Sequence, residues 1–143
     1  MKEFNRGIRK LNNEAETEAL GLELAAALEP GDIVALIGEL GSGKTSLTKY
    51  IAKGLGVKEE IISPTFNIVK IYESGIIPLA HFDVYRLEST EELWDIGADE
   101  IIGGDNVSVI EWADKVADVL PADSLLINLS YGEHEEERIA EII

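Results

Sequence analysis

Residues 38–45, read as GELGSGKT, have the spacing of a loop that binds a chain of phosphates, G-x-x-x-x-G-K-[ST]. Glycines allow the tight turns that bring successive backbone N–H groups to an anion, and the dipole of a following helix favours the same charge. Lys44 would reach the outer phosphate oxygens and the Thr45 hydroxyl would ligate Mg²⁺. The residues predicted to contact a nucleotide here are Gly38, Glu39, Leu40, Gly41, Ser42, Gly43, Lys44, Thr45 and Ser46.

The segments on either side of this loop agree with that interpretation. Residues 32–37 (DIVALI) form an almost entirely apolar run that suits a buried parallel strand, and residues 44–55 have a helical pattern. The alternative is a glycine-rich turn with an exposed lysine, which this strand-to-helix context disfavours. The sequence therefore predicts a nucleotide site.

Two acidic residues follow apolar runs and are candidates for a metal ligand or for activating water. Asp83 ends the run LAHFD and Glu111 ends the run VSVIE. An enzyme with this phosphate loop needs a carboxylate near Mg²⁺, commonly at the carboxyl end of a neighbouring strand. Ordinary solvated carboxylates also occupy strand ends, so the residues alone leave open which of the two binds the metal.

The loop Ser63-Pro64-Thr65-Phe66 and the histidine at position 81 allow two interpretations each. Thr65 could belong to a segment that senses the terminal phosphate, although a simple proline-containing loop is favoured on the residues alone. His81 fits a structural hydrogen-bonding role better than that of a general base. The chain has no cysteine and no H-x-x-x-H spacing, which disfavours a zinc site.

Charge and length limit the class of protein. The 143 residues contain 12 Lys+Arg and 28 Asp+Glu, giving a net charge of −16, which argues against strong unaided binding of nucleic acid or of an anionic membrane. No run approaches the 18 apolar residues of a membrane span, so we expect a cytoplasmic protein. The length predicts one domain over residues 1–143.

One segment concentrates negative charge. Residues 87–114 contain nine carboxylates and no Lys or Arg. A solvated face and an interface for a basic protein partner both fit this composition, and the sequence does not decide between them.

The remaining patterns predict an α/β fold, with a P-loop NTPase-like, mixed and mainly parallel sheet flanked by helices and a C-terminal β-hairpin. Thr90 is the expected cap of a short helix. The predicted helices are 14–28, 44–55, 91–96 and 113–120, and the predicted strands are 32–37, 66–73, 76–83, 107–110, 124–131 and 137–143.

The arginines and the missing base motifs narrow the choice of nucleotide and reaction. Only Arg86 and Arg138 follow the phosphate loop, too few for the arginine-rich lid of a small-molecule kinase. No Asn-Lys dipeptide is present, so the guanine motif Asn-Lys-x-Asp is absent and ATP is favoured over GTP.

Four segments together resemble the TsaE family, over roughly residues 14–138: GELGSGKTSLTK, SPTF (63–66), HFDVYRL (81–87) and IEW (110–112). The resemblance implies a small bacterial P-loop ATPase of tRNA threonylcarbamoyladenosine biosynthesis. It implies that Lys44 and Thr45 bind phosphate and Mg²⁺ and that Glu111 holds the metal. It also implies that Asp83 acts on the metal or the attacking water, Thr65 belongs to a mobile switch and Trp112 lies near the nucleotide.

The resemblance further implies an accessory role, in which ATP turnover supports the TsaD transferase and its partner TsaB. The catalytic residues would be Lys44, Asp83 and Glu111, with ATP and Mg²⁺ as cofactors. One departure is that Ala113-Asp114-Lys115 follows Trp112, where the family often has Pro-Glu-Arg. The alternatives are a small-molecule kinase and a nucleotide-gated interaction module in which hydrolysis is incidental.

Overall fold

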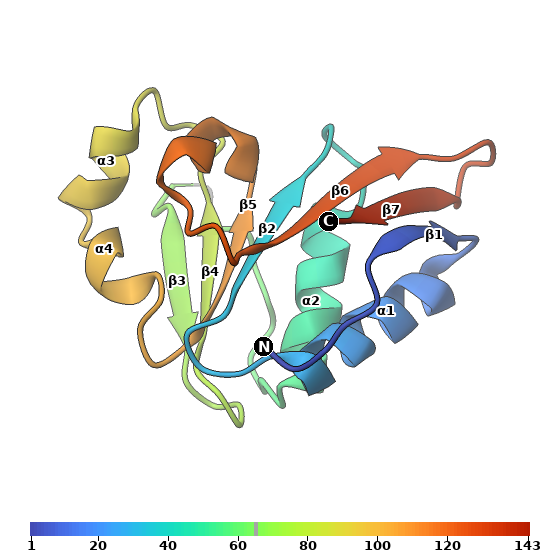
Figure 1. Ribbon diagram of the computed structural model, residues 1–143, viewed down its shortest axis with the longest axis horizontal. Coiled ribbons are helices and arrows are strands. Elements are labelled where there is room, and N and C mark those ends of the chain that lie inside the picture. Colours follow the sequence, from blue (N-terminus) through green and yellow to red (C-terminus); the bar gives the residue numbers. More distant parts are fainter. Residues whose placement is uncertain (65) are drawn as a thin grey trace.

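A computed structural model describes residues 1–64 and 66–143 (Figure 1). The described residues form a seven-stranded sheet in the order β1-β7-β6-β2-β5-β4-β3. Its four central strands are parallel neighbours, and antiparallel strands flank them on both sides. The strands are β1 (Gly7–Leu11), β2 (Ile33–Ile37), β3 (Val69–Tyr72), β4 (Leu79–Asp83), β5 (Val107–Glu111), β6 (Leu125–Tyr131) and β7 (Arg138–Ile142).

Helices cover both faces of this sheet (Figure 1). The longer α1 (Glu14–Ala27) and α2 (Lys44–Gly54) pack on one face. The short α3 (Thr90–Asp95), α4 (Ala98–Ile101) and the 3-10 helix η1 (Ala113–Val119) pack on the other. Alternate strand residues therefore enter two separate apolar layers: Val34 and Leu36 contact the α1–α2 side, whereas Ile33 and Ala35 contact the other.

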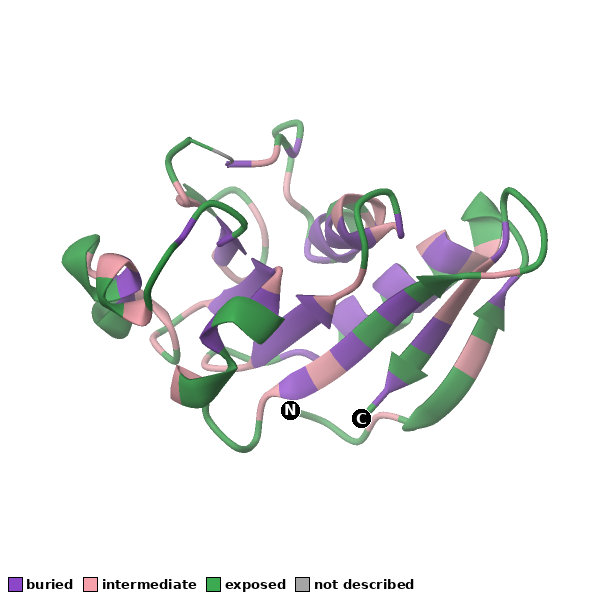
Figure 2. Cartoon of the chain, turned by 90° about the horizontal axis from the view of Figure 1, so that it is seen from above, coloured by how far each residue is buried: buried purple, intermediate pink, exposed green. Residues whose placement is uncertain are grey.

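Burial explains why the central strands have such apolar sequences. Every residue of β4 and of β5 is buried, because helices cover both faces there. Strand β6 instead alternates between buried and more exposed residues towards the hairpin, and the stripes are visible in Figure 2. Continuous burial thus marks β4 and β5 in the sheet, whereas alternation of buried and exposed residues marks the strand that leads into the hairpin.

The α/β class, the mixed sheet with parallel strands at its centre and the C-terminal hairpin of β6 and β7 are confirmed. Strand β1 was not predicted: its sequence GIRKL is mostly exposed and it gains strand structure by pairing with β7. The strand predicted from residue 66 begins at Val69, because Ile68 has a φ of 69° and donates its N–H to the Pro64 carbonyl (2.7 Å).

Two helix predictions were wrong in detail. Ser89, not Thr90, occupies the N-cap of α3, and the Thr90 hydroxyl donates to Asp118 Oδ1 (3.3 Å). The segment after Trp112 is a 3-10 helix with a kink at Val116, not a regular α-helix. Among the described residues, no helix is both long and apolar enough to cross a membrane.

Candidate nucleotide-binding site

The phosphate loop joins the carboxyl end of β2 to the first turn of α2, so the strand and helix predicted around it are both present. Strand β2 lies between β5 and β6, and its carboxyl end is where open α/β sheets bind ligands. Gly43 caps α2 in the left-handed region (φ 106°). The N-terminus of an eleven-residue helix therefore points into the loop and favours an anion there.

Lys44 is buried, with only 4% of its surface exposed. Its Nζ donates to the carbonyls of Gly38 and Glu39 (2.9 Å for the latter) and lies 3.9 Å from the centroid of the Trp112 ring. Burial lowers the pKa of Lys44, while the charges of Glu111, Asp83 and Asp114 act in the opposite direction. The loop thus holds a poorly solvated cation against its own carbonyls, where an anion would be attracted strongly.

Glu111 is the carboxylate in direct contact with the phosphate loop. The Thr45 hydroxyl donates to its Oε1 (2.9 Å), and His81 Nε2 lies 2.5 Å from its Oε2. Only 2% of Glu111 is exposed. Both oxygens of this buried carboxylate therefore have a hydrogen-bond partner, one from α2 and one from β4.

Asp83 lies beside Glu111, because the two residues are partners in the parallel pairing of β4 and β5. Its Oδ2 accepts from the Ser63 hydroxyl (2.9 Å) and its Oδ1 accepts from the Tyr85 N–H (3.0 Å). Asp83 thus connects the loop that contains Ser63 to strand β4. The two acidic residues predicted from strand ends meet at one edge of the sheet.

A cavity of about 390 Å³ lies in front of these groups. Glu39 and Gly38 line an adjoining cavity of about 450 Å³, which shares Trp112 with the first. Ser42 is buried in the loop, and Thr65 lies outside the described residues. The predicted residues that line the first cavity are Leu40, Gly41, Gly43, Lys44, Thr45, Ser46, Asp83, Glu111 and Trp112.

Comparison with known proteins identifies the family. The family model described as "Threonylcarbamoyl adenosine biosynthesis protein TsaE" matches residues 11–140. The chain belongs to the TsaE family. This match includes all four of the segments singled out in the sequence.

Individual relatives agree with this assignment. The tRNA threonylcarbamoyladenosine biosynthesis protein TsaE of Bacillus subtilis is 42% identical over 127 residues, covering 89% of this chain and 79% of the relative. The protein of the same name from Treponema pallidum is 46% identical over 114 residues, covering 80% and 84%. The crystal structure of Bacillus subtilis YdiB superposes with a TM-score of 0.81 at 34% identity, covering 99% and 87%.

Sequence reasoning missed two residues that contact the phosphate loop in this TsaE-family chain. The Tyr131 hydroxyl donates to the Leu40 carbonyl, and the Arg138 guanidinium donates to the Gly41 carbonyl (3.3 Å) and lies 4.8 Å from the Tyr131 ring. Both residues come from the β6–β7 hairpin. The hairpin was predicted, but no local signal indicated that it supports the phosphate loop.

The donor set at this site fits Mg²⁺. Thr45, Asp83 and Glu111 offer only oxygen atoms, the ligands that this ion prefers. Among residues 1–64 and 66–143, no three His, Asp or Glu side chains gather closely enough to hold an ion by themselves. A metal here would therefore need oxygens from water or phosphate to complete its coordination, as is usual for Mg²⁺.

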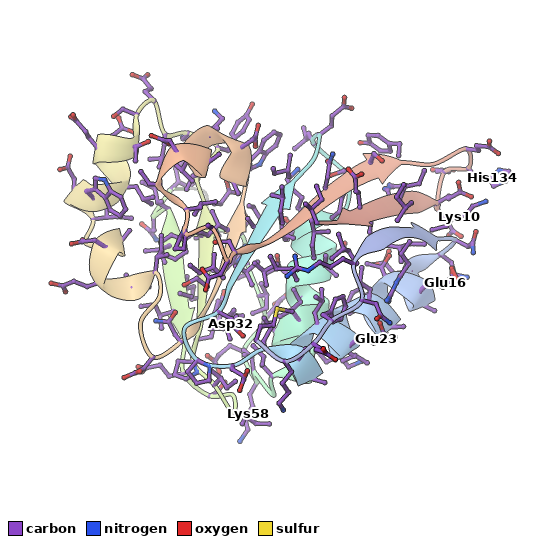
Figure 3. The ribbon with its side chains drawn as sticks, viewed as in Figure 1. Lys10, Glu16, Glu23, Asp32, Lys58 and His134 are labelled. Carbon is purple, nitrogen blue, oxygen red and sulfur yellow. The ribbon has the colours of Figure 1, made fainter. Side chains whose placement is uncertain are left out.

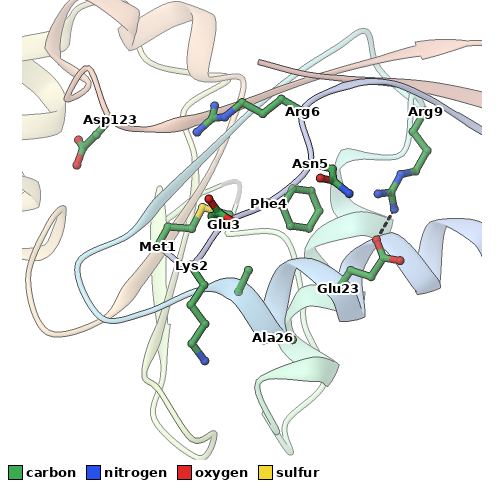
Figure 4. Close-up of a pocket in the computed structure, with 11 residues that line it drawn as sticks. Met1, Lys2, Glu3, Phe4, Asn5, Arg6, Arg9, Glu23, Ala26 and Asp123 are labelled. Carbon is green, nitrogen blue, oxygen red and sulfur yellow. Dashed lines mark hydrogen bonds and ion pairs between the residues drawn. The ribbon is translucent and has the colours of Figure 1, made fainter.

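A larger hollow of about 950 Å³ lies elsewhere, against the N-terminal segment (Figure 4). Lys2, Arg6 and Arg9 line it, and Arg9 pairs with Glu23 on α1. No residue of the phosphate loop and neither Asp83 nor Glu111 belongs to it. This hollow is therefore separate from the candidate nucleotide-binding site.

Proposed function

We propose that this chain binds ATP with Mg²⁺ and hydrolyses it as the accessory ATPase of bacterial tRNA threonylcarbamoyladenosine modification, acting with TsaD and TsaB. The observation that carries the proposal is the meeting of Lys44, Thr45, Asp83 and Glu111 around one cavity at the phosphate loop. The names of the relatives support the pathway.

Each of these groups has a role that its position allows. Lys44 and the N-terminus of α2 bind the phosphates. The Thr45 hydroxyl donates a hydrogen bond to Glu111, which leaves an oxygen lone pair that would hold Mg²⁺. When bound, the ion would supply positive charge against the phosphates. Asp83, which lies beside Glu111, would orient the attacking water. Trp112 borders both cavities and would contact the nucleotide.

Hydrolysis by the isolated chain should be slow. Lys44 is the one cation among the described residues that line the cavity, and Arg86 lies 4.4 Å from the exposed Phe66 ring instead. A second cation that stabilises the transition state is worth orders of magnitude in rate in related phosphoryl-transfer enzymes. We therefore expect the partners to raise turnover, by supplying a cation or by ordering the groups already present.

The charge of the acidic segment favours docking to a protein partner over direct binding of tRNA by this chain. In α3 and α4, Glu91, Asp95, Asp99 and Glu100 are exposed beside the exposed Trp94. Such a face repels phosphate and complements a basic protein surface. The chain would thus reach tRNA through partners that bind it.

The test is phosphate release from ATP and from GTP with Mg²⁺, with and without the TsaD–TsaB pair. We expect turnover of ATP in preference to GTP and a clear rise with the partners. Turnover that is the same with and without the partners would overturn the accessory role and favour a small-molecule kinase. Transfer of phosphate to an added acceptor would reveal such a kinase.

Glu111→Ala separates hydrolysis from binding, with Glu73→Ala as the matched control, since Glu73 is exposed just after β3 and lies outside both the cavity and the acidic segment. We expect Glu111→Ala to abolish hydrolysis and tRNA modification together while the control keeps both. Loss of hydrolysis with modification retained would favour the nucleotide-gated module instead.

A further inference from the structure

His81 is fully buried, yet the proposed function gives it no task. The other histidine, His134, lies at the turn between β6 and β7, at the far end of the molecule in Figure 3. Burial of a polar ring carries a free-energy cost unless its hydrogen bonds are satisfied. The hydrogen-bond partner of His81 therefore indicates why this ring is buried in the protein.

The position of His81 follows from strand geometry. Side chains alternate along a strand, so Leu79, His81 and Asp83 share one face of β4, and Val107, Val109 and Glu111 share the same face of β5. Leu79, Val107 and Val109 belong to the apolar layer beneath α1 and α2. His81 thus sits between that apolar layer and the edge where Asp83 and Glu111 meet, and it reaches along the sheet to Glu111.

The hydrogen bonds fix the proton on the imidazole ring. Nε2 faces Glu111 Oε2 at 2.5 Å, and a carboxylate oxygen accepts, so Nε2 carries the hydrogen. Nδ1 is buried and has no partner among residues 1–64 and 66–143. A lone pair left without a donor is better tolerated there than an N–H without an acceptor. A ring that carries its hydrogen on Nε2 therefore matches these hydrogen-bond partners.

We propose that His81 is a positioning residue that fixes the Glu111 carboxylate towards Mg²⁺, an inference that rests on the proposed function. His81 holds Oε2 from β4 while Thr45 holds Oε1 from α2. Because hydrogen bonds hold both oxygens of Glu111, the Thr45 hydroxyl keeps donating to Glu111. The lone pair of the Thr45 oxygen then points away from Glu111. Without His81 the carboxylate would rotate, and the metal ligands would no longer be fixed relative to the phosphate loop.

Two substitutions of His81 separate positioning from packing. His81→Phe keeps a ring but removes the donor, and His81→Gln restores an N–H near the position of Nε2. Ser108→Ala is the matched control, since Ser108 is also fully buried in the neighbouring β5 and its hydroxyl donates to Asn106 Oδ1 (3.1 Å). Calorimetric titration with ADP, once with Mg²⁺ and once with EDTA, gives the gain in affinity due to the metal.

We expect His81→Phe to reduce that gain about 10- to 100-fold, the usual effect of losing a group that orients a metal ligand, and His81→Gln to retain it within about 3-fold. Affinity in EDTA should be unchanged in every variant. An unchanged gain in His81→Phe, or equal losses with Mg²⁺ and with EDTA, would overturn the proposal.

A second measurement requires neither nucleotide nor a His81 variant. Nitrogen NMR of the two imidazole rings should show a hydrogen on Nε2 of His81, and Glu111→Ala should shift the His81 signals while leaving those of His134 unchanged. A ring without a hydrogen on Nε2 would overturn the contact. If the unmodified chain binds no ADP, the proposed function fails, and this spectrum still tells whether His81 holds Glu111.

Discussion

Substitution of two glycines in the phosphate loop should have measurably different effects, because their surroundings differ. Gly41 has a φ of 80°, and a Cβ there would lie 2.7 Å from the Tyr131 hydroxyl oxygen. Gly43 has a φ of 106°, and a Cβ there would meet nothing within 4 Å. Gly41→Ala therefore adds both backbone strain and a collision, whereas Gly43→Ala adds strain alone.

The size of each effect follows from these two terms. Left-handed backbone costs a non-glycine residue about 1–2 kcal/mol, which is the expected loss of unfolding free energy for Gly43→Ala. The Tyr131 ring is half exposed and can move away from a new methyl group, but it then loses the hydrogen bond to the Leu40 carbonyl. That bond is worth about 1 kcal/mol, so Gly41→Ala should cost about 2–3 kcal/mol in total.

A double-mutant cycle with Tyr131→Phe, measured by urea unfolding, isolates the contribution of the Tyr131 hydrogen bond to the cost of Gly41→Ala. In the Tyr131→Phe background the hydroxyl is already absent, so Gly41→Ala should cost about 1 kcal/mol less than in the unmodified chain. Gly43→Ala should cost the same in both backgrounds. Equal costs of Gly41→Ala in the two backgrounds would refute the claim that Tyr131 supports the loop.

Three further predictions concern charged and ionisable groups. Lys44→Met should abolish nucleotide binding while changing the unfolding free energy by less than about 1 kcal/mol. The loss of two hydrogen bonds is offset because a poorly solvated charge is removed. A large loss of stability in urea would contradict this. The hydrogen bond from the Glu133 N–H lowers the pKa of Glu137 below its ordinary 4.5, so its contribution to stability is present above pH 4.5 and is lost as pH falls below that value. Acid unfolding of Glu137→Gln should therefore depend less on pH than that of Glu136→Gln, its exposed neighbour. Burial, with the hydrogen bond to Glu14, raises the pKa of Tyr50 to about 12, so stability should fall as pH rises from 10, where unfolded tyrosine ionises, to about 12. Tyr50→Phe should remove that loss, and a phenolate absorbance titration in which all tyrosines ionise together would contradict it.

Local patterns were enough to predict the elements that carry the site. The apolar run before Gly38 and the helical run after it are set by neighbours in sequence, and the structure has β2 and α2 there. The sequence also placed Asp83 and Glu111 at strand ends. It could not rank them, because the distinction depends on Thr45 of a different element reaching Glu111.

Features that depend on distant partners were not predictable. Residues 7–11 acquire strand structure by pairing with residues 138–142, and their own sequence has only a weak apolar alternation. Residues 66–68 are apolar enough for a strand, but Ile68 bends the chain back to Pro64. The support of the loop by Tyr131 and Arg138 arises from the packing of two segments that no short-range pattern connects.

The pairing of β1 with β7 also bears on when the site becomes complete. During synthesis the phosphate loop emerges long before Tyr131 and Arg138, and β1 has no sheet partner until residues 138–142 exist. Contacts between segments so far apart in sequence form slowly, because the entropy of closing the intervening chain must be offset first. The phosphate loop is therefore synthesised early but gains its supporting contacts late, and the proposed binding of phosphate should appear only in the final phase of folding.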